Sequence, residues 1–400
     1  MMPTMVATNT RSYGVHFIIV FLFICLNLRL SFSATDPVLT VMMRDLGLHV
    51  GSSGLFALLP VMSLGVAAPL GAKLVTWVKP RALITWALVL ALCGIVWRSY
   101  GGAIGLFGGT AAIGLGLGIT GSVILGVVKE LFPGRIPELM GAYTACVCMG
   151  TSLGSAAGDP VMLMMGGWQR GLLFWALPLA LALVLWVELI HRLHPLNMRE
   201  QKLHASIRLL LRQGKAWWVS VFYIFRVAGS WAIVVWLAAL MQRRGLPPVE
   251  AGLALGLTTA CEIPSTLLSD HLTQWLGSKS RLMYIAIPLS AVAVWGLLLG
   301  PLHWWPFFSV LFGLCIGAVF ALGMTLIVEN SADAAATVAL SGMAQGLGFV
   351  VGGLLAWATS AAMNTAHPAL WMACAYTLFA LGGLISGLRS DSPARVSVTP

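Results

Sequence analysis

The sequence predicts an all-α membrane protein, with twelve transmembrane helices arranged in two pseudo-symmetric six-helix bundles. Hydrophobic residues make up 59% of the 400 residues and charged residues only 9%, whereas a soluble domain carries about 25% charged residues. The apolar residues form twelve runs, close to the roughly 20 residues that cross a membrane as a helix. A charged break at residues 191–215 separates six runs from six, as two parallel repeats require.

The first run, residues 15–35, is too long for the core of a signal peptide, and no small-residue cleavage site follows it. We therefore expect it to be retained as the first helix. The other runs lie at 54–76, 81–97, 103–128, 138–163 and 170–190 in the first half, and at 216–241, 248–270, 282–300, 304–328, 333–358 and 367–388 in the second. This order predicts a tail (1–14), a bundle (15–190), a linker (191–215), a second bundle (216–388) and a tail (389–400).

The basic residues predict the orientation of the chain. Sixteen of the 23 Lys and Arg residues flank the runs on the side of the N-terminus, and two lie within runs. The five on the other side are Arg44, Arg98, Arg170, Arg243 and Arg244. Loops rich in Lys and Arg stay in the cytoplasm, so we expect a multi-pass protein of the bacterial inner membrane with both termini cytoplasmic. Because these charges stand singly in short loops, the net charge of +10 does not predict a nucleic-acid partner.

Several function classes lack their signatures in this sequence. The loops are too short for a soluble catalytic domain, and no phosphate-binding G-x-x-x-x-G-K-[ST] motif occurs. The seven cysteines fall in apolar runs without metal-ligand spacing. We therefore predict that the chain is not an enzyme, uses no cofactor and binds no metal.

Two runs carry glycines at close spacing. Gly114 and Gly118 lie in the fourth run, and Gly150, Gly154 and Gly158 recur every four residues in the fifth. Such stripes let helices approach closely in lipid. They predict either close packing alone or smooth faces that move past one another during transport.

Three charged residues stand out within the apolar runs, because a charge at mid-membrane costs at least about 2.5–3.5 kcal/mol on insertion scales. Arg29 and Arg226 occupy equivalent helices of the two halves and could hold an anion between two guanidinium groups. The alternative for Arg29 is a structural role. Glu262, two residues before Pro264, is a candidate proton carrier because burial favours the neutral carboxyl; the alternative is a static pair with Arg226.

Further polar and aromatic residues could complete the substrate site. Gln345 and Tyr143 lie on the matching eleventh and fifth runs and could hydrogen-bond a substrate, although for Tyr143 packing between helices is the favoured interpretation. Trp231, five residues after Arg226, could form a wall for a planar ligand, or face lipid. Glu329 and Asp333 flank the turn after the tenth run and are expected to be solvated.

The chain resembles the major facilitator superfamily, and within it the bacterial cyanate permease and 2-nitroimidazole exporter family. The resemblance covers nearly the whole chain and is carried by residues 26–30, 58–61, 107–114, 140–143 and 340–348. Two motifs depart from the superfamily pattern. The loop from Gly71 to Arg81 has no aspartate, and the fifth run has Ser155 and Asp159 at the proline and final-glycine positions of the antiporter motif.

The resemblance implies a major facilitator fold that works by alternating access. Together with the buried charges, it predicts a proton-coupled secondary transporter of a small anion or small planar polar compound, such as cyanate or a nitroimidazole. The alternatives are a broader drug or metabolite efflux antiporter and a membrane sensor without a transport cycle. The expected partners are the small-molecule substrate, protons and the lipid bilayer, and the expected state is a monomer.

Overall fold

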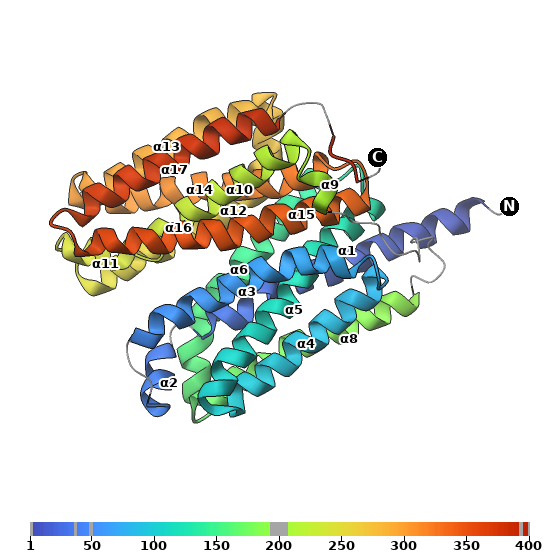
Figure 1. The fold of residues 1–400 in the computed structure, drawn as a ribbon, viewed down its shortest axis with the longest axis horizontal. Coiled ribbons are helices and arrows are strands. Elements are labelled where there is room, and N and C mark those ends of the chain that lie inside the picture. The colour runs from blue at the N-terminus through green and yellow to red at the C-terminus, as the bar shows by residue number, and fades with distance from the viewer. Residues whose placement is uncertain (1–2, 36–37, 48–50, 193–206, 392–394, 399–400) are drawn as a thin grey trace.

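Apolar runs become helices because the interior of a membrane offers no water to satisfy backbone N–H and C=O groups. The computed structural model describes residues 3–35, 38–47, 51–192, 207–391 and 395–398, and these residues form helices joined by short turns (Figure 1). The first half contains α1 (Pro3–Ser33), α2 (Leu39–Asp45), α3 (Gly51–Leu74), α4 (Pro80–Tyr100), α5 (Gly102–Leu131), α6 (Ile136–Met164), α7 (Trp168–Phe174) and α8 (Ala176–Arg192).

The second half follows residues 193–206, a part of the expected linker that lies outside the described residues. It begins with α9 (Ile207–Leu210), α10 (Gly214–Val234), α11 (Leu237–Arg243), α12 (Pro248–Leu276) and α13 (Lys279–Leu299). It continues with η1 (Leu302–Trp304), α14 (Trp305–Glu329), α15 (Ala334–Leu347), the π-helical turn η2 (Gly348–Gly352), α16 (Gly353–Ala358), η3 (Thr359–Asn364) and α17 (Pro368–Ser390).

The predicted all-α membrane fold is confirmed. Among the described residues, ten helical stretches are long and apolar enough to cross a membrane. The apolar part of α3, Leu58–Leu74, and the 29-residue helix α6 complete two sets of six. Three predicted spans are interrupted. The sixth comprises α7 and α8, the seventh comprises α10 and α11, and the eleventh passes through the π-helical turn η2.

The structure differs from the sequence expectations at both tails and at one arginine. Helix α1 begins at Pro3, so most of the expected N-terminal tail continues the first helix. Residues 395–398 of the expected C-terminal tail fold back onto the bundle. Arg98, expected in a loop, is fully buried in the last turn of α4. Its guanidinium donates to Thr35 Oγ1 (2.8 Å) and to the Ser31 carbonyl (3.0 Å), which ties α4 to the end of α1.

Glycines without a Cβ determine how closely the helices pack within the first half. A Cβ at Gly114 would lie 2.3 Å from the Ser63 Cβ, and one at Gly118 would lie 2.5 Å from the Ala67 Cβ, so α5 packs tightly on α3. A Cβ at Gly150 would lie 2.1 Å from the Leu26 carbonyl oxygen, which brings α6 onto α1. These are close backbone approaches of the kind that small residues permit in membranes.

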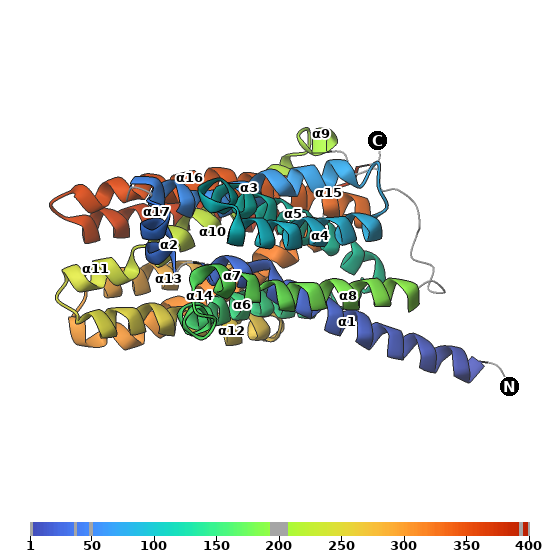
Figure 2. The same ribbon diagram turned by 90° about the horizontal axis from the view of Figure 1, so that it is seen from below.

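The two halves meet along two seams in different layers. In one layer α15 packs against α3 and α5, and in the other α6 packs against α12 and α14 (Figure 2). Small residues line both seams. A Cβ at Gly126 of α5 would lie 2.4 Å from Val338 of α15, and one at Gly141 of α6 would lie 2.7 Å from the Thr266 carbonyl oxygen of α12.

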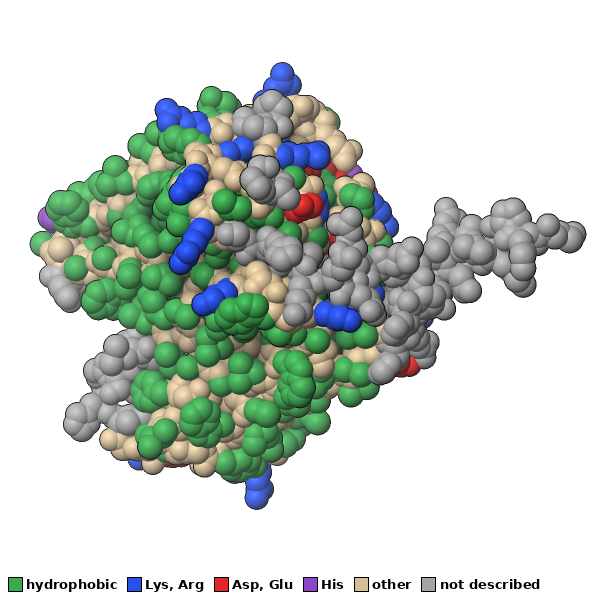
Figure 3. All heavy atoms as spheres, turned by 45° about the vertical axis from the view of Figure 1, so that its right-hand side comes forward, with side chains coloured by type: hydrophobic (Ala, Val, Ile, Leu, Met, Phe, Trp, Pro, Cys, Tyr) green, Lys and Arg blue, Asp and Glu red, His purple; other side chains and the backbone are tan. Residues whose placement is uncertain are grey.

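Both chain termini lie at one end of the molecule, which we call the terminal end (Figure 1). Gly126 and Gly141 are near this end of their helices, so their contacts close the terminal end across both seams. Figure 3 turns the terminal end towards the viewer and shows Lys and Arg side chains gathered there, beside large areas of hydrophobic surface.

Candidate functional site

Arg29 of the first half contacts two aromatic rings of the second half. Its guanidinium carbon lies 5.2 Å from the ring centroid of Trp231 on α10 and 5.8 Å from that of Phe349 in η2. Such cation–π contacts hold a guanidinium by its face, whereas its N–H groups donate in the plane of the group. Arg29 is half-buried, so it lies at the junction of the halves rather than in lipid.

Arg226 lies 12 residues into α10 and also contacts aromatic rings. Its guanidinium carbon is 4.1 Å from the ring centroid of Phe320 on α14 and 5.0 Å from that of Tyr223. The Nε atom of Arg226 is buried and has no hydrogen-bond partner among the described residues. A buried donor without a partner costs folding free energy. Such an atom therefore indicates a ligand or a water molecule that accepts its hydrogen bond.

Three side chains lie near both arginines. The hydroxyl groups of Tyr143 and Tyr223 and the thiol of Cys148 each lie within electrostatic range of both Arg29 and Arg226. Tyr143 and Cys148 come from α6, and Tyr223 comes from α10. The structure therefore brings both predicted arginines into one region at the junction of the two halves.

Glu262 lies near the middle of α12 and joins the two halves. The thiol of Cys148 on α6 donates a hydrogen bond to Glu262 Oε2, with an Sγ–Oε2 distance of 3.4 Å. Arg226 is within electrostatic range of Glu262, but the two form no ion pair among the described residues. On the neighbouring helix α14, Gly317 packs against the backbone of Glu262. The half-buried side chain thus lies between helices, and no ion pair with it occurs among the described residues.

The remaining predicted residues differ in their relation to the arginines. Trp231 is in direct contact with Arg29. Tyr143 is buried, and its ring stacks with Phe21 at a centroid distance of 6.1 Å. Gln345 is buried on α15 and donates from Nε2 to Ser341 Oγ (2.6 Å) one turn earlier.

The glycine stripes lie outside this region. Gly114 and Gly118 pack on α3, and Gly150 and Gly154 pack on α1, so they join helices of the same half. Gly158 is buried at the same face of α6. The seams between the halves use different glycines, among them Gly126, Gly141 and Gly342.

Four residues of the site were not identified from the sequence: Cys148, Tyr223, Phe320 and Phe349. Tyr223 precedes Arg226 by three residues, a spacing that places two side chains on one face of a helix, so this residue was within reach of sequence reasoning. Cys148, Phe320 and Phe349 stand in apolar runs among many similar residues, and no local pattern marks them.

Known proteins with similar sequences are transporters. The chain is 30% identical over 375 residues to the 2-nitroimidazole transporter of Escherichia coli (strain K12), covering 92% of this chain and 94% of that protein. It is 26% identical over 341 residues to the cyanate transport protein CynX of the same organism, covering 85% and 88%. It is also 27% identical to the uncharacterized transporter YycB of Bacillus subtilis (strain 168), covering 82% of each chain.

Solved structures share the fold at low sequence identity. A bacterial homologue of the iron transporter ferroportin in its outward-facing state superposes with a TM-score of 0.75 at 13% identity, covering 94% of this chain and 99% of that one. The proton:xylose symporter XylE superposes with a TM-score of 0.71 at 14% identity, covering 95% of each chain. The family model of the Major Facilitator Superfamily matches residues 21–353. The chain is therefore a member of the Major Facilitator Superfamily, similar to the cyanate and 2-nitroimidazole transporters within it.

Proposed function

We propose that this membrane transporter moves a small anion or small planar polar compound across the bacterial inner membrane, coupled to protons and by alternating access. The observation that carries the proposal is the pair Arg29 and Arg226. Both guanidinium groups lie against aromatic rings at the junction of the two halves, and the buried Nε atom of Arg226 has no hydrogen-bond partner among the described residues. Guanidinium edges bind planar oxyanions with two parallel hydrogen bonds, and flat aromatic walls suit a planar ligand.

Proton coupling is supported by the position of Glu262. The site holds two guanidinium groups and one titratable carboxyl, so its net charge rises when Glu262 takes up a proton. A monoanion then binds more favourably, because the protonated Glu262 carboxyl no longer repels it. This linkage favours carrying one anion together with one proton. Cyanate is a monoanion, and the chain is similar to a cyanate transport protein over 85% of its length.

A broader efflux antiporter is the second candidate function. The rings of Trp231, Tyr223, Phe320 and Phe349 around the arginines favour it, because an aromatic site also accepts larger flat compounds. The similarity to a 2-nitroimidazole transporter points to the same type of ligand.

A thermal-shift screen of the purified protein tests the function. A ligand that binds only the folded state increases the free energy of unfolding, by about 2.7 kcal/mol at a concentration of 100 times Kd. The melting temperature therefore rises with ligand concentration. We expect cyanate or another small anion that accepts hydrogen bonds to stabilise the protein, and chloride at equal ionic strength not to do so. Stabilisation by large aromatic drugs, without any by small anions, would favour the efflux antiporter.

The proposed orientation places the terminal end in the cytoplasm, since Lys and Arg gather there. A cysteine at Gly134, in the exposed turn between α5 and α6, is expected to react with an impermeant thiol reagent only after the cells are permeabilised. A cysteine at Ala366, in the exposed turn before α17 at the other end, is expected to react in intact cells. The parent chain, whose seven cysteines are free, gives the background. The reverse labelling pattern would contradict the orientation.

A further inference from the structure

The last described residues of the chain are bonded to the turn between α14 and α15. The amide of Val396 donates to the Asn330 carbonyl (2.6 Å), and the amide of Ala332 donates to the Val396 carbonyl (2.9 Å). Val396 and Ser331 thereby form an isolated parallel β-bridge. Main-chain bonds on both sides of one residue hold this part of the tail in a defined position.

The tail is also bonded to the segment that links the two halves. The side-chain amide of Gln213 donates to the Ser397 carbonyl (2.6 Å), and the amide of Ser397 donates to Gln213 Oε1 (3.3 Å). Gln213 follows α9, which packs on α3 of the first half and α15 of the second, and Leu210 of α9 is fully buried. The tail therefore fixes a short helix that bridges one of the two seams.

Two tail side chains are inserted into the core. Val396 is 0% exposed and Val398 is 7% exposed. Both belong to the largest hydrophobic cluster, which contains Val128 of α5 in the first half and Val338 of α15 in the second. The tail thus buries apolar surface at the place where the two halves meet.

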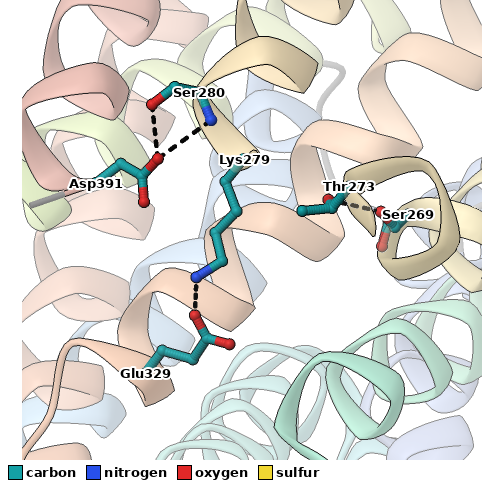
Figure 4. Close-up of polar contacts among 6 residues, drawn as sticks. All are labelled: Ser269, Thr273, Lys279, Ser280, Glu329 and Asp391. Atoms are coloured by element: carbon teal, nitrogen blue, oxygen red, sulfur yellow. Dashed lines mark hydrogen bonds and ion pairs between the residues drawn. The ribbon is translucent and has the colours of Figure 1, made fainter. Parts of the chain in front are cut away.

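Polar contacts at the terminal end fix the helix ends that lie next to the tail. Asp391 accepts hydrogen bonds at Oδ2 from the Ser280 amide (3.2 Å) and hydroxyl (2.6 Å), which fixes the end of α17 to the start of α13 (Figure 4). Glu329, expected to be solvated, forms an ion pair with Lys279 instead (Figure 4). Beyond Asp391, Arg395 lies within electrostatic range of Lys129 at the end of α5; these two like charges repel each other, so the main-chain bonds and the buried valines hold the tail in place.

We propose that residues 395–398 and Gln213 form a clasp that keeps the terminal end closed, and that its release is a step in the opening of that end. Opening requires α15 to separate from α3 and α5, which divides the cluster that holds Val396 and Val398. The two hydrogen bonds between Gln213 and Ser397 also hold α9 in contact with α3 and α15, the helices on either side of the same seam. Contacts made only in the closed state shift the equilibrium towards it.

A buried reporter cysteine tests the clasp without any transported substrate, so the result does not depend on the proposed function. Val338→Cys is suitable because Val338 is fully buried and packs on Gly126 across the seam. Its reaction with N-ethylmaleimide is measured in the full chain, in a chain ending at Asp391 and in the full-length Val396→Asp variant. A chain ending at Val398 keeps every clasp residue and is the matched control. Val294→Cys, fully buried within the second half, reports on unfolding.

We expect the chain ending at Asp391 and the Val396→Asp variant to react about tenfold faster at Val338→Cys, and Gln213→Ala to change the rate less in the same direction. The control chain and the Val294→Cys reporter are expected to keep their rates. Unchanged reaction at Val338→Cys in both clasp variants would overturn the proposal. So would an equal increase at Val294→Cys, because the tail would then stabilise the fold as a whole rather than the closed seam.

Discussion

Replacing Arg29 by lysine is expected to lower transport of a small planar anion by at least about tenfold, or roughly 1.4 kcal/mol of binding free energy. Lysine keeps the positive charge and can still lie against the rings of Trp231 and Phe349, which now contact the guanidinium face. It cannot supply the two parallel N–H groups of a guanidinium edge. A loss of transport in this variant would therefore report on the hydrogen-bond geometry of the guanidinium and not on its charge.

The measurement is uptake of labelled cyanate into proteoliposomes, together with the thermal shift that cyanate produces. Arg44→Lys is the matched control because Arg44 is exposed at the end of the molecule remote from the termini. We expect the Arg29→Lys protein to insert and purify normally but to show little stabilisation by the anion. If it transported at the parent rate, Arg29 would serve only to join the two halves through its aromatic contacts.

The fold could be predicted from the sequence because the membrane imposes a single strong constraint. Apolar runs of sufficient length must be helical, and the charged break divided them correctly into two sets. Hydropathy carries no information on backbone irregularities within a span. The break between α10 and α11 at Val235–Trp236 and the π-helical turn Gly348–Gly352 depend on local packing. In η2, Gly348 packs on the Tyr223 ring and Gly352 on the Ile224 carbonyl.

The charged residues of the site could be predicted because a charge within an apolar run is expensive and therefore rare. Arg29, Arg226 and Glu262 stood out for this reason. Their partners did not, since a cavity-facing Phe and a lipid-facing Phe look the same in sequence. Phe320 contacts Arg226, whereas Phe307 on the same helix is exposed. The role of Cys148 required a contact between α6 and α12, helices more than one hundred residues apart in the chain.

Glu262→Gln has the second large expected effect, because it removes the titratable group from the proposed coupling site. Glutamine keeps the size of the side chain, and its carbonyl oxygen can still accept the hydrogen bond from Cys148. No ion pair with Arg226 is lost among the described residues, so we expect normal yield and stability. A large drop in stability would instead indicate that Glu262 balances the charge of Arg226, since an uncompensated buried charge costs several kcal/mol.

Two transport measurements separate coupling from binding in this variant. Accumulation of labelled cyanate driven by a pH gradient is expected to collapse, because a glutamine cannot load and release a proton. Exchange of labelled for unlabelled cyanate moves no net proton and is expected to continue, because both arginines and their aromatic contacts remain. Glu250→Gln, in the first turn of the same helix, is the matched control and is expected to keep both activities. Gradient-driven accumulation at the parent level by the Glu262→Gln protein would remove this carboxylate from the coupling mechanism.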